Sequence, residues 1–127
     1  MSSKKFIFIS FLTVLYFILG RIIGWFILKN TRFWQMIEND NIHHYQLGIF
    51  LLLVSFLFLK RKPELRDYFL AIGSGAIIDE AIFIFKFINP SFGRFYAFYS
   101  PVKFLMGLLF ESCLFIIFSF VILSHKK

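Results

Sequence analysis

Four ionisable residues lie inside long apolar segments of the chain: Arg21, Asp79, Glu80 and Glu111. On membrane-insertion scales, a charged side chain at the centre of an apolar helix costs about 2.5 to 3.5 kcal/mol, and a carboxyl group can lower that cost by taking up a proton. Charges left without partners would therefore destabilise the fold. We expect these four residues, the polar cluster, to compensate one another and to form the candidate functional site.

The charges of the polar cluster do not balance. Arg21 offsets one of the three carboxylates, so the cluster carries two excess negative charges if all its members are ionised. Proton uptake by one or two carboxyl groups would neutralise them, and so would a divalent metal ion held by carboxylate and imidazole groups. Lys86, seven residues after Asp79 on the same helix face, is a third candidate partner, although its long side chain can reach the outer interface instead. The candidate metal ligands are three carboxylates and a histidine pair: His43, His44, Asp79, Glu80 and Glu111.

Four apolar segments are long enough to carry these residues through a membrane. A hydrocarbon core about 30 Å thick requires about 20 predominantly apolar residues per helix. The sequence therefore predicts an all-α polytopic membrane protein, a four-transmembrane-helix bundle that forms a single domain over residues 1–127. The helices are expected at about 6–28, 44–60, 67–88 and 102–124.

The composition supports lipid as the solvent. Of the 127 residues, 59% are hydrophobic and 21 are phenylalanine, whereas soluble domains are roughly 45 to 50% apolar. The net charge of +7 comes from Lys and Arg residues at the segment ends instead of one basic face, so we expect no nucleic-acid partner. A single cysteine excludes an intrachain disulfide framework.

The basic residues also predict an orientation. Eight lie on the side of the termini and of the connection between the second and third segments: Lys4, Lys5, Lys60, Arg61, Lys62, Arg66, Lys126 and Lys127. Five lie on the other side: Lys29, Arg32, Lys86, Arg94 and Lys103. The positive-inside rule then puts both termini in the cytoplasm and the polar cluster in the outer half of the bilayer, in a prokaryotic cytoplasmic membrane.

This orientation brings the polar cluster to one level of the membrane. Arg21 lies seven residues from the outer end of its segment, and Asp79 and Glu111 each lie nine residues from theirs. Pairing of the second and third segments about residue 64 predicts Gly48 opposite Asp79 and Glu80, with His44 about one turn further out. Close helix packing is expected at five glycines: Gly20, Gly24, Gly48, Gly73 and Gly107.

Two stretches, 43–48 (HHYQLG) and 73–80 (GSGAIIDE), resemble small uncharacterised prokaryotic multi-pass membrane proteins. In those proteins a histidine-rich helix start is followed by a glycine-rich helix that bears Asp-Glu. The resemblance covers less than a third of the chain and brings no activity with it. It implies that the histidines and the Asp-Glu pair belong to one site.

Three classes of function remain open. The first is a small membrane protein whose carboxylates bind a divalent metal or carry protons, with Arg21 as counter-ion and His44 as gate or fourth ligand. The second is a structural or assembly subunit whose buried charges fix helix pairing, as a homo-oligomer or in a larger membrane complex. The third is a metal-dependent lipid-modifying enzyme. None of the common motifs of soluble enzymes occurs in the sequence.

Overall fold

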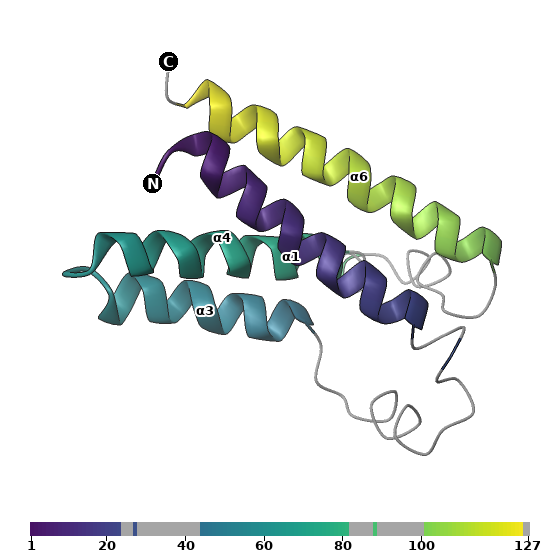
Figure 1. Cartoon of the computed structure of the whole chain (residues 1–127), viewed down its shortest axis with the longest axis horizontal. Coiled ribbons are helices and arrows are strands. Elements are labelled where there is room, and N and C mark those ends of the chain that lie inside the picture. Colours follow the sequence, from purple (N-terminus) through teal and green to yellow (C-terminus); the bar gives the residue numbers. More distant parts are fainter. Residues whose placement is uncertain (24–26, 28–43, 82–87, 89–100, 126–127) are drawn as a thin grey trace.

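The fold was derived from a computed structural model, which describes residues 1–23, 27, 44–81, 88 and 101–125 of the chain. Within these residues all regular secondary structure is helical, so the all-α prediction is confirmed for this part of the chain (Figure 1). The four helices of the described residues are α1 (Ser3–Ile23), α3 (His44–Phe58), α4 (Pro63–Asp79) and α6 (Pro101–Ser124).

The observed bounds of three helices lie close to the expected ones. Helix α6 begins one residue before the expected 102–124, and α3 ends two residues before position 60. Helix α1 begins three residues before position 6 and is bounded at Ile23; the expected continuation to position 28 lies almost entirely outside the described residues.

Helix α4 differs from the expected 67–88 at both ends. It begins four residues early because Pro63, whose fixed φ suits the first helical turn, is followed by Glu64, whose negative charge favours a helix N-terminus. It is bounded at Asp79, and Glu80 is its C-cap, with φ −114° and ψ 22°. Residues 82–87 lie outside the described part of the chain.

A tight reversal joins α3 to α4 and corrects the expected register. The Lys62 N–H donates to the Leu59 carbonyl at 3.0 Å, so the chain turns three to four residues earlier than the expected centre at 64. As a result Gly48 lies against Gly73 and Ile77 instead of against Asp79. The prediction that Gly48 faces Asp79 is wrong by about one helical turn.

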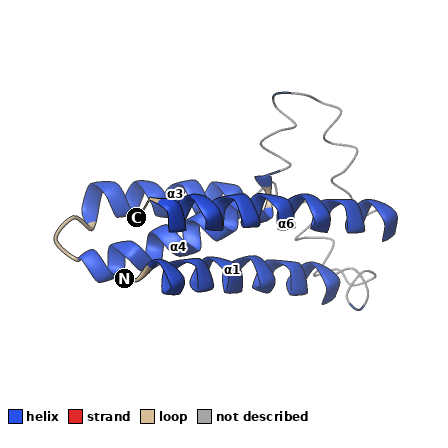
Figure 2. Cartoon of the chain, turned by 90° about the horizontal axis from the view of Figure 1, so that it is seen from above, coloured by secondary structure: helices blue, strands red, loops and turns tan. Residues whose placement is uncertain are grey.

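Small residues allow α4 to approach both of its neighbours closely. A Cβ added at Gly48 would lie 2.6 Å from the Gly73 carbonyl oxygen, and one added at Gly75 would lie 2.7 Å from the Ser10 carbonyl oxygen. The Ser10 hydroxyl also donates to the Ala71 carbonyl at 2.9 Å. Helix α4 therefore lies directly against α3 on one side and α1 on the other (Figures 1 and 2).

Of the other predicted packing glycines, Gly20 shows no such approach. Gly20 is exposed, and a Cβ added there would meet no atom within 4 Å. Gly107 is half-buried, and Gly24 lies outside the described residues. Close packing of small residues is thus seen around α4, at Gly48, Gly73 and Gly75, and not at Gly20.

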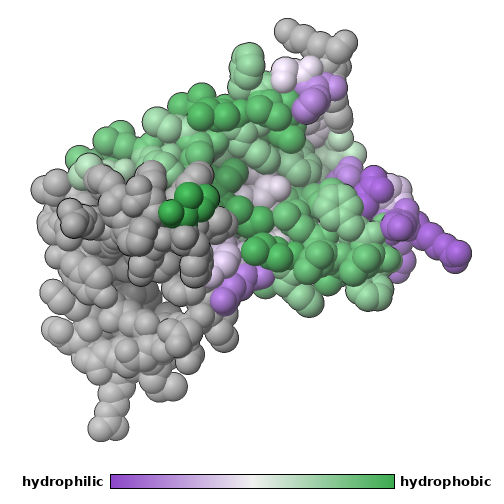
Figure 3. All heavy atoms as spheres, turned by 180° about the vertical axis from the view of Figure 1, so that it is seen from behind, coloured by the Kyte–Doolittle hydropathy of each residue, from purple (hydrophilic) through white to green (hydrophobic). Residues whose placement is uncertain are grey.

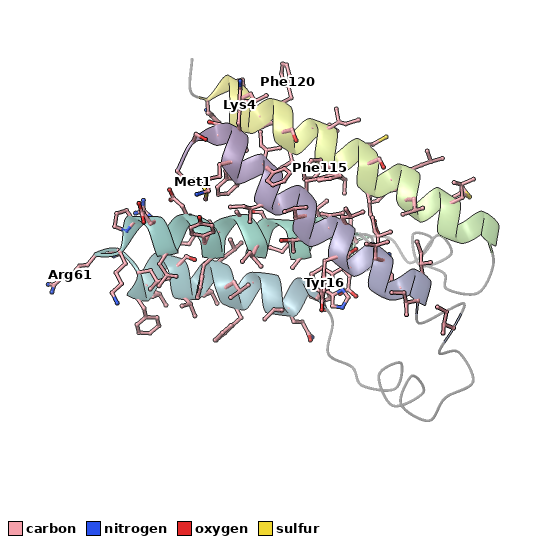
Figure 4. The ribbon with its side chains drawn as sticks, in the orientation of Figure 1. Met1, Lys4, Tyr16, Arg61, Phe115 and Phe120 are labelled. Atoms are coloured by element: carbon pink, nitrogen blue, oxygen red, sulfur yellow. The ribbon has the colours of Figure 1, made fainter. Side chains whose placement is uncertain are left out.

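Helix α6 packs mainly against α1 through aromatic rings. The rings of Phe11 and Phe115 are 5.7 Å apart, and those of Phe6 and Phe118 are 6.2 Å apart. Figure 4 shows Phe115 between α6 and α1, whereas Phe120 points away from the molecule. These ring contacts leave much of α6 without a neighbour among the described residues.

The distribution of polarity is the reverse of that in a soluble domain. The buried apolar residues of the described chain are small or medium-sized: Val14, Ala71, Ala76, Ile78 and Ala81. Large apolar side chains are exposed along the helices, and hydrophobic residues cover much of the face in Figure 3. Helix α1 and the part of α6 from Leu105 to Ser124 are long and apolar enough to cross a membrane.

A buried charge cluster as a candidate cation site

Arg21 joins three helices through two carboxylates. Its Nη2 donates to Oδ1 of Asp79, the last residue of α4, and to both carboxylate oxygens of Glu111 in α6, at 2.9 and 3.1 Å. All three side chains are buried. Charge-assisted hydrogen bonds of this kind are stronger than those between neutral groups. The Arg21 guanidinium therefore holds α1, α4 and α6 together at one level.

His44 contacts the other oxygen of the same carboxylate. Its Nδ1 lies 2.9 Å from Oδ2 of Asp79 and 3.6 Å from Oε1 of Glu80. When Asp79 is ionised its oxygen can only accept, so Nδ1 is then the donor in the shorter contact. Asp79, fully buried, thus gives one oxygen to Arg21 and the other to His44.

Glu80 is positioned by the start of α3. The backbone N–H of Tyr45, in the first turn of α3, donates to Oε2 of Glu80 at 3.2 Å. The first N–H groups of a helix have no partner within the helix, and the helix dipole favours negative charge beside them. A carboxylate from the end of α4 therefore caps the beginning of α3, which leaves its other oxygen facing His44.

The structure adds one residue to the site, Phe17. Its ring is stacked on the His44 imidazole, with 3.9 Å between the centroids and 20° between the planes. Sequence reasoning did not single out this residue among so many phenylalanines. Its spacing four residues before Arg21 was the available signal, because residues i and i+4 of a helix lie on one face.

This stack makes a prediction about energetic coupling. In a double-mutant cycle, Phe17→Leu and His44→Leu should show a coupling energy of about 0.5 to 1.5 kcal/mol in the free energy of unfolding, the range found for stacked aromatic pairs. The cycle is measured by denaturant unfolding in detergent. A parallel cycle with Phe11→Leu, whose ring contacts Phe115 instead, should give a coupling near zero. Equal coupling in the two cycles would contradict the role of Phe17.

The structure brings all four members of the polar cluster together but divides the candidate metal ligands. His44, Asp79 and Glu80 each offer one ligand atom, and these atoms lie within 4.8 Å of one another. Glu111 is not part of this group, and both of its oxygens contact the Arg21 guanidinium. His43 lies outside the described residues. We call His44, Asp79 and Glu80 the cation group.

Comparison with known proteins gives no further guidance. No protein family, no curated protein and no solved structure matches this chain. No function, ligand or partner is therefore carried over from a relative, and the contacts of the polar cluster are the guide to function.

Proposed function

We propose that this chain is an integral membrane protein that crosses the bilayer four times and binds a divalent cation through the cation group. The observation that supports the cation is the convergence of one imidazole nitrogen and two carboxylate oxygens from His44, Asp79 and Glu80. Metal–ligand distances of about 2.0 to 2.1 Å imply about 2.8 to 3.4 Å between neighbouring ligand atoms, from octahedral to tetrahedral geometry. The distances from His44 Nδ1 to the two carboxylates, 2.9 and 3.6 Å, lie close to this range.

The charge balance favours the same conclusion. Among the described residues, Arg21 supplies one positive charge against three buried carboxylates, and Lys86 lies outside these residues. Buried charges require compensation, since the cost of removing each one from water is several kcal/mol. A divalent cation beside Asp79 and Glu80 would offset the negative charge of these two carboxylates. It would displace the hydrogen from His44 Nδ1, because only a deprotonated nitrogen binds a metal.

The exposed apolar surface supports the membrane location. Side chains such as Tyr16, Phe58 and Phe120 are more than 70% exposed, which is costly in water and favourable in lipid. At 1.5 Å per residue, α1 and α6 are about 32 and 36 Å long and exceed the hydrocarbon thickness of about 30 Å. Helices α3 and α4 are shorter, about 22 and 25 Å, and their ends carry the cation group.

The distribution of basic residues supports the orientation. The start of α1, the end of α6 and the α3–α4 turn lie at the same end of the molecule (Figure 1). The exposed Lys4, Lys5, Lys60, Arg61 and Lys62 are therefore on one side. By the positive-inside rule this side is cytoplasmic, in a prokaryotic cytoplasmic membrane, and the cation group lies in the outer half of the bilayer.

The Arg21 contacts favour a second role for the polar cluster. Because one guanidinium contacts carboxylates of both α4 and α6, it specifies which helices pair and at what level. Buried charges are known to act in this way in some helical proteins. In our proposal Arg21 and Glu111 fix the pairing of the helices, and the cation group on the other side of Asp79 binds the ion.

Metal analysis tests the proposal. Protein purified in detergent without chelator, and then supplied with Zn²⁺, Mn²⁺ or Mg²⁺ and freed of excess, should retain about one divalent ion per chain. Glu80→Gln should weaken retention at least about tenfold, because even changes to groups that only orient metal ligands cost 10- to 100-fold. Glu64→Gln, which changes an exposed glutamate at the start of α4, is the matched control and should retain the ion.

Two results would end the cation proposal. One is near-zero metal in the wild-type protein under all three conditions. The other is equal retention by the wild type and by Glu80→Gln. A protein that behaves as a soluble monomer without detergent would contradict the membrane location instead.

A further inference from the structure

A basic surface lies at the end of the molecule opposite the polar cluster. Five exposed side chains form it, two from the start of α1 and three from the α3–α4 turn: Lys4, Lys5, Lys60, Arg61 and Lys62. We call this surface the basic end. Figure 4 shows Arg61 pointing away from the turn, and Figure 3 shows hydrophilic residues gathered at this end.

Among the described residues, few carboxylates lie close to the basic end in the sequence. The nearest along the chain are Glu64, which is exposed, and Asp67, which is half-buried and has Arg66 at 3.9 Å. Lys5 Nζ lies 5.1 Å from the centre of the Tyr68 ring, a cation–π arrangement that links the start of α1 to α4. The basic end therefore keeps a clear excess of positive charge.

Apolar surface adjoins these charges directly. Leu57 and Phe58 are 64% and 76% exposed, and Lys60 follows them after a single residue. Phe8, 58% exposed, lies one helical turn after Lys4 and Lys5. A change from lipid-compatible to cationic surface within so few residues marks the level of the phospholipid headgroups.

We infer that the basic end binds the headgroups of anionic phospholipids in the leaflet where it lies. The inference rests on the membrane-spanning part of the proposed function and does not depend on the cation group. A soluble polyanion would match the charges but would leave the adjoining apolar surface of Leu57 and Phe58 uncovered. A phospholipid covers both, with its phosphate on the lysines and its acyl chains on the apolar side chains.

Lipid retention in a mixed bilayer tests this inference. The full chain is reconstituted into nanodiscs of equimolar phosphatidylcholine and phosphatidylglycerol and then extracted into mild neutral detergent. Native mass spectrometry counts the lipids that stay bound. We expect the number of bound phosphatidylglycerol molecules to exceed that of phosphatidylcholine by about fivefold or more. Even one basic residue near an anionic membrane surface contributes about 1 kcal/mol, which corresponds to this ratio. Extraction in about 1 M salt, where the Debye length is about 3 Å, should remove most of this preference.

Two variants make the test specific. Lys60→Gln/Arg61→Gln/Lys62→Gln should reduce the preference for phosphatidylglycerol several-fold and leave the part that Lys4 and Lys5 contribute. Glu64→Gln, which removes the exposed negative charge beside the turn, should increase it. Equal retention of the two lipids by the wild type, or an unchanged preference in the triple variant, would overturn the inference. Failure of the wild type to enter nanodiscs would instead contradict the membrane-spanning proposal.

Discussion

Arg21→Met should lower the free energy of unfolding by about 3 to 5 kcal/mol, the cost of breaking a buried ion pair by removing one partner. The substitution leaves Asp79 and Glu111 buried without the guanidinium that contacts both of them. Methionine keeps most of the apolar stem of the arginine side chain, so the decrease in the free energy of unfolding results mainly from the missing charge. Denaturant unfolding in detergent measures it. Arg66→Met is the matched control: this half-exposed arginine lies 3.9 Å from Asp67, and its loss should cost about 0 to 1 kcal/mol.

A second substitution shows whether charge is the cause. Adding Glu111→Gln to Arg21→Met removes one of the two stranded carboxylates and should recover part of the lost stability. Because Glu111 is not part of the cation group, a double variant that folds should still bind the divalent ion. An Arg21→Met protein as stable as Arg66→Met, or a double variant less stable than the single one, would contradict a compensating role for Arg21.

Gly48→Ala should lower the free energy of unfolding by about 1 to 3 kcal/mol, the usual cost of overpacking a tight interface. The new Cβ would lie 2.6 Å from the Gly73 carbonyl oxygen and 2.7 Å from Ile77 Cγ1, so the backbones of α3 and α4 must separate. His44 lies one turn before Gly48 and contacts Asp79, so the separation should also weaken cation retention.

Gly20→Ala provides the comparison for Gly48→Ala. No atom lies within 4 Å of a Cβ at Gly20, and alanine favours a helix over glycine by about 1 kcal/mol. This variant should therefore be as stable as the wild type or slightly more stable, with cation retention unchanged. Thermal or denaturant unfolding in the same detergent compares the two. Equal destabilisation by both substitutions would show that the close approach of α3 to α4 is unimportant.

Local features of the sequence were sufficient to locate most of the helices. Long apolar segments predict helices because a backbone in an apolar environment must satisfy its own hydrogen bonds. The observed bounds of α3 and α6 lie within two residues of the bounds expected from the sequence. The start of α4 was missed because a proline was taken as part of the turn, although it is well accommodated in the first turn of a helix. Four membrane spans and a cytoplasmic location of both termini stay predictions.

The sequence by itself determined that Arg21 and the three carboxylates need partners, because a charge in an apolar segment is too costly to leave alone. Only the tertiary structure decided which atoms pair. It places Arg21 between Asp79 and Glu111, gives the second Asp79 oxygen to His44, and stacks Phe17 on the imidazole. Those choices depend on the rotation and register of the helices. Register is set by close approaches such as that of Gly48 to Gly73, and hydropathy along a uniformly apolar helix carries almost no information about it.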